Sequence, residues 1–295
     1  MKTRRAVLAL GAGAAVATTL PAGGAHAADS GVVRQLRELE RERGARLGVY
    51  ARDLAGGRTV VYRADELFPM CSLFKTLAAA AVMREFDQDG EYLAKRVFYT
   101  QEDVTKAGGG EITKLEENIA RGLTVAELCS AAIAQSDNTA GNLLLRELGG
   151  PTAITRLCRS LGDRTTRLDR WEPELNSAEP TRVTDSTSPR AIGRTYARLV
   201  LGDSLVPRHR ELLTGWMLAN TTSWERFRKG LPKDWVIADK TGAGSYGTNN
   251  NAGIAWPPGR PPIVLSVLTT KTEPTAPRDN ELVARAAKLL ADALG

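Results

Sequence analysis

Ser72-Leu73-Phe74-Lys75-Thr76-Leu77-Ala78-Ala79-Ala80-Ala81-Val82-Met83 is the stretch that decides the fold of this 295-residue chain. It belongs to a segment from Pro69 to Gln88 that is apolar on nearly every side of a helical wheel. A helix that is apolar all round is a buried one. We therefore predict a central helix over this segment, around which the rest of the chain packs.

Ser72 and Lys75 give that helix a possible chemistry. Residues three apart lie on the same helical face, so the lysine is expected near the serine oxygen. Ser72 is expected in the first turn of this helix, where free N–H groups and the helix dipole favour developing negative charge. A buried lysine loses solvation and shifts toward the neutral amine, which can accept a proton. The pattern predicts a serine nucleophile with a lysine base; the alternative is a serine at a helix start and a lysine that reaches outward.

Strands are expected near both termini, with helices between them. The predicted strands are 47–53, 59–62, 235–239, 251–256 and 263–270, and the predicted helices are 32–43, 124–135, 139–148, 151–160, 189–200, 208–218 and 279–294. Residues 88–123 are expected to form a polar connection that Gly108-Gly109-Gly110 makes flexible. Residues 167–189 show no period, and long irregular segments of this kind are often functional. This order predicts one sheet built from both ends of the chain and a helical lobe inserted between them.

The first 27 residues have the features of an export signal. A basic start at Lys2, Arg4 and Arg5 precedes an apolar run over 6–20 and the small residues Ala25-His26-Ala27. The paired arginines indicate the twin-arginine route. A membrane anchor is the alternative, but the run is short and interrupted by glycines. We expect a secreted protein of residues 28–295.

The composition argues against several other classes. The formal net charge of +6 falls to +3 without the three basic residues of the signal. A net charge this small does not indicate a nucleic-acid-binding protein. Cys71, Cys129 and Cys158 are expected to be buried thiols. His209 is the single histidine beyond residue 27, so a zinc site or a Ser-His-Asp triad would depend on it alone. We expect no metal and no cofactor, and a base other than histidine.

Three further motifs accompany Ser72. Ser136-Asp137-Asn138 lies between two predicted helices, and Lys240-Thr241-Gly242 ends a predicted strand, where glycine permits close approach of a ligand to the backbone. Glu172 and Asn176 lie in the long irregular segment, within Arg170-Trp171-Glu172-Pro173-Glu174-Leu175-Asn176. Taken singly, each could be a turn, a strand end or a polar loop.

Taken together and in this order, the motifs resemble those of the class A serine β-lactamases, in particular secreted actinobacterial members. The resemblance covers nearly the whole mature chain. It implies an α/β two-lobe fold, shared with penicillin-binding proteins, in which an antiparallel sheet from both termini is flanked by helices. The lobes would be an α/β lobe of about 28–66 and 215–295 and an all-helical lobe of about 67–214, within a single catalytic domain.

The resemblance also implies a role for each motif. Ser72 resembles the nucleophile, and Lys75 and Glu172 resemble the two candidate bases for acylation. Glu172 with Asn176 resembles the pair that activates the deacylating water, and Ser136 the hydroxyl that relays a proton to the ring nitrogen. The groups implied in substrate binding are Asn138, Lys240, Thr241, Gly242 and Arg226. The N–H groups of Ser72 and Ala243 resemble the oxyanion hole. Arg170 and Asp185 resemble the ion pair at the neck of the loop.

Some positions depart from the common pattern. Gly247-Thr248-Asn249 stands where many relatives carry an arginine, so Arg226 is expected to supply that charge, unless it is a solvated residue beside Arg228. At the mouth of the cleft, an often aromatic position is Glu111 or Ile112. Cys71 matches a disulfide-forming cysteine of some relatives, but Gly244 stands at the partner position, so no bridge is expected.

The implied activity is hydrolysis of the β-lactam amide bond of penicillins, and of some cephalosporins, through a serine acyl-enzyme, with antibiotic resistance as its consequence. A small-molecule β-lactam is the expected partner of a monomeric enzyme without nucleic-acid or membrane binding. Two rivals remain: a D-Ala-D-Ala peptidase and a β-lactam sensor that stays acylated. Both lack the water site of Glu172 and Asn176. The sequence does not rank substrates or inhibitors.

Overall fold

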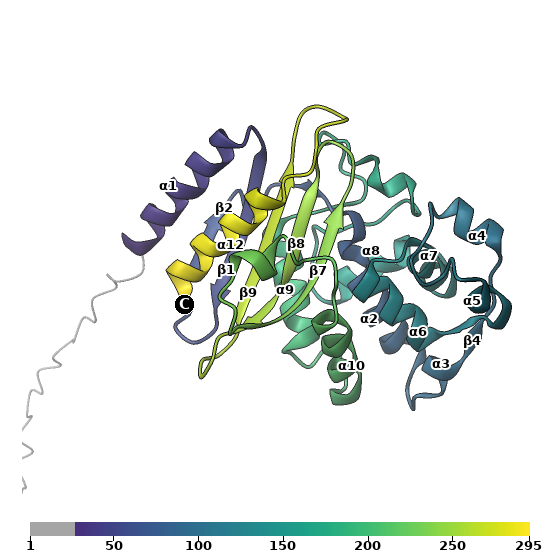
Figure 1. Ribbon diagram of the computed structural model, residues 1–295. Coiled ribbons are helices and arrows are strands. Elements are labelled where there is room, and N and C mark those ends of the chain that lie inside the picture. Colours follow the sequence, from purple (N-terminus) through teal and green to yellow (C-terminus); the bar gives the residue numbers. More distant parts are fainter. Residues whose placement is uncertain (1–26) are drawn as a thin grey trace, which may run out of the picture.

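The computed structural model describes residues 27–295, and the predicted export signal lies almost wholly outside them. Its centre is a five-stranded antiparallel sheet in the order β2-β1-β9-β8-β7 (Figure 1). The strands are β1 (Arg46–Asp53), β2 (Thr59–Tyr62), β7 (Val236–Ala243), β8 (Asn249–Trp256) and β9 (Ile263–Thr270). Strands from the start and the end of the chain therefore pair side by side, as predicted, and β1 meets β9 over its full length.

Helices cover both faces of the sheet. On one face lie α1 (Ala27–Glu42) and α12 (Asn280–Leu294), whose apolar sides share a buried cluster that includes Leu36 and Leu290 (Figure 1). On the other face, α9 (Pro189–Val200) packs on β1, β8 and β9, and α10 (Pro207–Leu218) packs on β7. The short helix α11 (Phe227–Gly230), which the sequence did not predict, packs on α12.

The central segment is buried as predicted, but its helix begins later. Phe68–Pro69 form the short strand β3, which pairs with β6 (Ser186–Thr187), and Cys71–Leu73 form a 3₁₀ turn. Helix α2 then runs from Phe74 to Phe86, and every residue from Phe74 to Met83 is buried. The prediction that Ser72 lies in the first turn of one helix over 69–88 was wrong, because Cys71 takes a left-handed conformation (φ 49°) that separates strand from helix.

The remaining helices pack around α2. They are α6 (Val125–Ser130) with a π-helical continuation (Ala131–Gln135), α7 (Asn138–Glu147) and α8 (Thr152–Ser160). Thr124 and Glu127 form the capping box that opens α6, as their spacing predicts.

The prediction of a polar connection over 88–123 was wrong. This stretch contains the helices α3 (Glu91–Ala94), α4 (Gln101–Lys106) and α5 (Glu116–Arg121), and a two-stranded ribbon of β4 (Arg96–Val97) and β5 (Leu123–Thr124). Each of these helices buries a single residue, respectively Leu93, Val104 and Asn118. Helices this short cannot show an apolar period, which is the reason the pattern was missed.

The segment 167–189 is irregular, as predicted, apart from β6 and a 3₁₀ turn at Glu174–Ser177. No helix within residues 27–295 is long and apolar enough to cross a membrane.

Candidate active site

The predicted site residues come from four separate parts of the fold. Ser72 lies in the 3₁₀ turn before α2 and Lys75 in the first turn of α2 itself. Ser136 and Asn138 flank the start of α7, and Lys240 lies within β7, which packs against the turn of Ser72. The long loop contributes Glu172, 2% exposed, and Lys75 and Lys240 have no exposed surface. The elements thus bring three ionisable side chains together out of bulk water.

Ser72, Lys75 and Glu172 form the first group of contacts. The Ser72 hydroxyl donates to Glu172 Oε1 over 3.3 Å, and Lys75 Nζ lies 3.0 Å from the same oxygen. Lys75 Nζ also donates to the backbone oxygen of Ser136 (2.8 Å) and to Asn138 Oδ1 (2.6 Å). Lys75 Nζ thus has three acceptors around it, as many as the N–H donors of an ammonium. In this arrangement the acceptor for the Ser72 proton is Glu172.

Ser136 and Lys240 form the second group. Ser136 has a left-handed backbone (φ 60°) at the end of the π-helical segment. Lys240 Nζ donates to Ser136 Oγ over 2.9 Å and to the Thr241 carbonyl over 3.0 Å. Burial, with the positive charges of Lys75 and Arg226 nearby, holds the pKa of Lys240 well below its usual value. An anionic ligand beside Lys240 would oppose these effects and stabilise its ammonium form.

Glu172 is held at both its carboxylate and its backbone. Asn176 Nδ2 donates to Glu172 Oε2. Asn142 forms a reciprocal pair with the Glu172 backbone, since its amide nitrogen donates to Glu172 O and its oxygen accepts from Glu172 N, both over 2.9 Å. The sequence reasoning missed Asn142. The available signal was its position four residues beyond Asn138, on the same face of α7.

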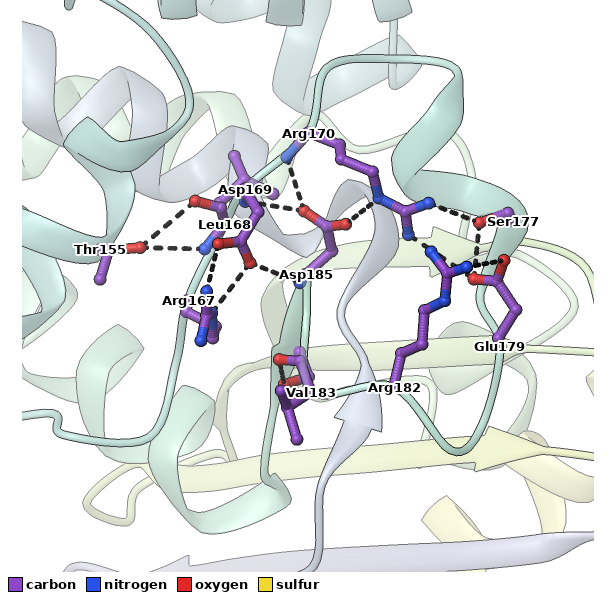
Figure 2. Close-up of polar contacts among 11 residues, drawn as sticks. Thr155, Arg167, Leu168, Asp169, Arg170, Ser177, Glu179, Arg182, Val183 and Asp185 are labelled. Carbon is purple, nitrogen blue, oxygen red and sulfur yellow. Dashed lines mark hydrogen bonds and ion pairs between the residues drawn. The ribbon is translucent and has the colours of Figure 1, made fainter.

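The neck of the loop is closed by a network centred on Asp185 (Figure 2). Its buried carboxylate accepts from Arg170 Nε over 2.5 Å and from the backbone N–H groups of Asp169 (2.8 Å) and Arg170 (2.9 Å). The Asp169 carboxylate in turn accepts from Asp185 N over 3.1 Å and pairs with Arg167. Arg170 and Asp185 therefore meet as expected, and Asp169 extends the contact into a reciprocal clamp.

Gly242 allows β7 to approach the nucleophile turn. A Cβ atom at this position would lie 2.8 Å from Met70 O and 3.3 Å from Ser72 N. The strand continues to the half-buried Ala243, which pairs with Asn249 on β8. The close approach brings the Ala243 end of β7 beside the backbone of Ser72, as an oxyanion hole made from both residues requires.

Arg226 is buried, being 8% exposed, and not a solvated surface residue. Its Nη1 donates to Asn250 O over 3.0 Å and its Nε to Asn280 Oδ1 over 3.1 Å. Burial, followed by the charge of Arg278, lowers the pKa of Arg226. The positive charge of Arg226 in turn contributes to the lowered pKa of Lys240.

The mouth of the cleft is fixed by Asp137, which caps α7. Its carboxylate accepts from the backbone N–H groups of Ile112 (3.0 Å) and Thr113 (2.9 Å). Glu111 is exposed and pairs with Lys114, whereas Ile112 packs against the core.

The cysteines and the histidine play no part in these contacts. Cys71, Cys129 and Cys158 are buried free thiols, as predicted. His209 is buried against Asp87, with 2.7 Å between Nε2 and Oδ2, and serves the packing of α10 on the end of α2.

This fold and these contacts define a class: two-lobe serine acyl-transfer enzymes whose nucleophile lies on a Ser-x-x-Lys turn beside a Lys-Thr-Gly strand. Within that class, residues 31–294 match the family described as the β-lactamase enzyme family. β-Lactamases of Streptomyces lavendulae and Streptomyces fradiae are 67% and 65% identical, each over 99% of this chain and over 97% and 96% of their own. The chain belongs to the β-lactamase enzyme family.

Solved structures of β-lactamases have the same fold as this chain. A β-lactamase from Streptomyces albus G has a TM-score of 0.89 at 67% identity, over 90% of this chain and all of that one. A variant of an ancestral Gram-negative class A β-lactamase has a TM-score of 0.83 at 48% identity, over 89% of this chain and 98% of its own. The chain is a class A serine β-lactamase of actinobacterial type, an enzyme that hydrolyses β-lactams and confers resistance to them.

Proposed function

We propose that the chain hydrolyses penicillins, and some cephalosporins, by acylation of Ser72 followed by hydrolysis of the ester with a water activated by Glu172. The observation that carries this proposal is the position of Glu172 Oε1, within 3.3 Å of Ser72 Oγ and 3.0 Å of Lys75 Nζ. One carboxylate is thereby in reach of both the nucleophile and the lysine, and its second oxygen is oriented by Asn176.

In the acylation step, the Ser72 oxygen attacks the β-lactam carbonyl and its proton passes to Glu172, directly or through a water. The N–H groups of Ser72 and Ala243 stabilise the oxyanion, and breaking the C–N bond leaves the ring nitrogen in need of a proton. Ser136 supplies that proton, and Lys240, 2.9 Å from its oxygen, stabilises the developing alkoxide. The proton taken from Ser72 leaves Glu172 through the adjacent Lys75 and reprotonates Ser136, so both residues regain their starting state before deacylation. Lys240, Thr241 and Arg226 bind the substrate carboxylate, and Asn138 binds the side-chain carbonyl.

In the deacylation step, Glu172 removes a proton from a water that attacks the Ser72 ester. The expelled Ser72 oxygen takes this proton back from Glu172, 3.3 Å away, which restores the carboxylate, and the ring-opened acid leaves. Asn176 and the backbone contacts of Asn142 keep Glu172 oriented toward the ester while this occurs. A β-lactam sensor or a D-Ala-D-Ala peptidase lacks such a water site, and we therefore prefer β-lactam hydrolysis as the function.

The test is a steady-state assay with penicillin, a chromogenic cephalosporin and a D-Ala-D-Ala peptide, combined with intact-mass measurement. Rapid multiple turnover of the β-lactams supports the proposal. A stable adduct without turnover would identify a sensor, and cleavage of the peptide in preference to the β-lactams would identify a peptidase.

We further propose that residues 1–27 direct export and are removed, that residues 28–295 act as one monomeric catalytic domain of two lobes, and that the enzyme works outside the cell. The basic start, the apolar run and the small-residue site support the export proposal. Protein recovered from culture medium should begin at residue 28 by N-terminal sequencing and elute as a monomer on size exclusion; retention in the cell at full length would contradict the export proposal.

A further inference from the structure

Four arginines line a concave surface that contains none of the site residues described above. Arg190, Arg194 and Arg198 come from α9, and Arg164 comes from the loop after α8. The concavity has a volume of about 180 Å³. A cavity needs only about 10–15 Å³ to hold a single water molecule. There is therefore room for an ion together with its hydration.

The three arginines of α9 follow one another at steps of four residues and so lie on one face of the helix. Like charges at this spacing destabilise a helix. Packing does not require them, because α9 meets the core through Ile192, Tyr196 and Leu199, while Arg194 and Arg198 are exposed. Only a negative charge from outside α9 can therefore reduce the repulsion between these arginines.

The acidic residues of the concavity relieve this repulsion only at Arg190. Asp65 pairs with Arg190 over 2.7 Å. Asp163 is buried, and its carboxylate accepts from the backbone of Thr165 (2.8 Å) and Thr166 (2.9 Å) and from the hydroxyl of Thr195 (3.0 Å).

The other three arginines of the concavity keep their charge unpaired. Within the described part of the chain, no carboxylate lies within ion-pair distance of Arg164, Arg194 or Arg198. Four guanidinium groups against two carboxylates leave an excess of two positive charges facing the hollow.

We propose that this concavity, defined by Arg164, Arg190, Arg194 and Arg198, binds a phosphate group. A guanidinium presents a planar fork of N–H donors that matches two oxygens of a phosphate, and such pairs are among the stronger hydrogen bonds of proteins. Arginines on two segments around one hollow suit a tetrahedral dianion with oxygens on several sides. The phosphate can belong to a free ion or to a phosphate polymer, and the same forks serve both.

The test is a titration of the mature enzyme with inorganic phosphate and, separately, with polyphosphate, at constant ionic strength kept with chloride. Amide chemical shifts of Gly162 to Thr165 report on the concavity itself. We expect a saturable shift that weakens about tenfold or more in Arg194→Ala and in Arg198→Ala, the loss expected for one charged hydrogen bond. Arg37→Ala, which removes an exposed arginine from α1, is the matched control and should bind like the parent protein. Hydrolysis of penicillin without phosphate should be unchanged in all three variants.

Saturation by both probes, lost in the α9 variants, supports a site that a free phosphate can fill. Saturation by polyphosphate alone, lost in the same variants, supports the site with a polymer as the source. The proposal is overturned if the shifts rise without saturation, or if the α9 variants and Arg37→Ala bind equally. It is also overturned if the only saturable shifts are those of amides beside Ser72 and Lys240, since that result describes phosphate in the catalytic cleft.

Discussion

Lys75 Nζ lies 3.0 Å from Glu172 Oε1, and neither side chain has any exposed surface. The same carboxylate oxygen accepts the Ser72 hydroxyl. Because the three N–H donors of Lys75 are each matched by an acceptor, the lysine stabilises the Glu172 carboxylate and orients the Ser136–Asn138 loop in this state. For Lys75 to act as the acylation base, it must first lose a proton, and Glu172 is within reach to take it. The pair is therefore one proton-transfer unit.

Ser72→Ala should abolish covalent labelling by penicillin and leave the fold intact. Ser72 is buried in the turn before α2, and its hydroxyl is the oxygen that reaches Glu172. Intact-mass spectrometry after exposure to penicillin measures the adduct directly. Ser160→Ala, at the end of α8, is the control and should be labelled like the parent protein. A full adduct on the Ser72 variant would remove this residue from the mechanism.

Arg226→Ala should raise KM for penicillins about ten- to a hundredfold, with a smaller effect on kcat. The estimate corresponds to a charged hydrogen bond of about 1.5–3 kcal/mol to the substrate carboxylate. Lys229→Ala, which removes an exposed cation three residues away, should change neither constant. Arg226→Lys should recover part of the loss, because it restores charge without the fork. Equal kinetics of the Arg226→Ala variant and the parent protein would show that Arg226 only holds Asn250 and Asn280.

The lowered pKa of Lys240 predicts an alkaline fall in kcat/KM for carboxylate-bearing substrates. Carboxylate binding needs the ammonium form, and a group whose pKa is lowered loses its proton at a lower pH than an ordinary lysine. The activity should therefore decline as the pH rises through this lowered value, well before an exposed lysine would titrate.

Lys240→Arg tests this assignment, since a guanidinium stays charged across the range and should move the decline to higher pH. The measurement is a pH profile of kcat/KM, which reports groups of the free enzyme. Lys233→Arg, an exposed lysine in the same segment of the chain, should leave the profile in place. An unchanged decline in Lys240→Arg would assign it to another group.

Most of the fold could be predicted because its large elements carry periodic apolar patterns. The strands of both termini and helices such as α9 and α12 fell within a few residues of their predicted ends. The region 88–123 could not be predicted, because its helices have four to six residues and each buries one of them. Nor could the turn at Ser72, where the left-handed Cys71 is a non-glycine residue that gives no local signal.

The site was predictable where a motif marks a residue and unpredictable where only the fold does. Ser72, Glu172 and Lys240 stand in recognisable motifs. Asn142 and Asp169 act on the backbone of the long loop, and the only sequence signal for either is that Asn142 lies four residues beyond Asn138.

Asp185→Asn should weaken the neck of the loop and slow deacylation more than acylation. The change removes the charge that pairs with Arg170 but keeps the size of the side chain. We expect a loss of about 1–3 kcal/mol in the free energy of unfolding, as for a charged hydrogen bond whose partner stays partly buried. Thermal unfolding and pre-steady-state kinetics with penicillin measure the two effects.

Glu179→Gln is the matched control for the neck. Glu179 lies 3.6 Å from Arg170 at the outer side of the loop, where ion pairs contribute about 0–1 kcal/mol. It should leave both the unfolding temperature and the deacylation rate close to those of the parent protein. Equal effects of the two variants, or a loss of acylation alone in Asp185→Asn, would contradict the assigned role of the clamp.

Glu172→Gln should convert the enzyme into one that reacts with penicillin and fails to release it. The ester on Ser72 needs a water with a base beside it, and losing a positioned general base costs about 10²–10⁴-fold in rate, or roughly 3–5 kcal/mol of barrier. With Glu172 neutral, Lys75 loses its buried counter-charge and is pushed toward the amine that can accept the Ser72 proton. Acylation should therefore persist, with one acyl group per molecule by intact mass and a product burst without a steady state. Glu174→Gln, an exposed carboxylate two residues along the same loop, should turn over like the parent protein. No acyl group on Glu172→Gln would show that Lys75 cannot replace Glu172 in acylation. Parent-like turnover would remove Glu172 from deacylation and, with it, the main argument against a sensor or a peptidase.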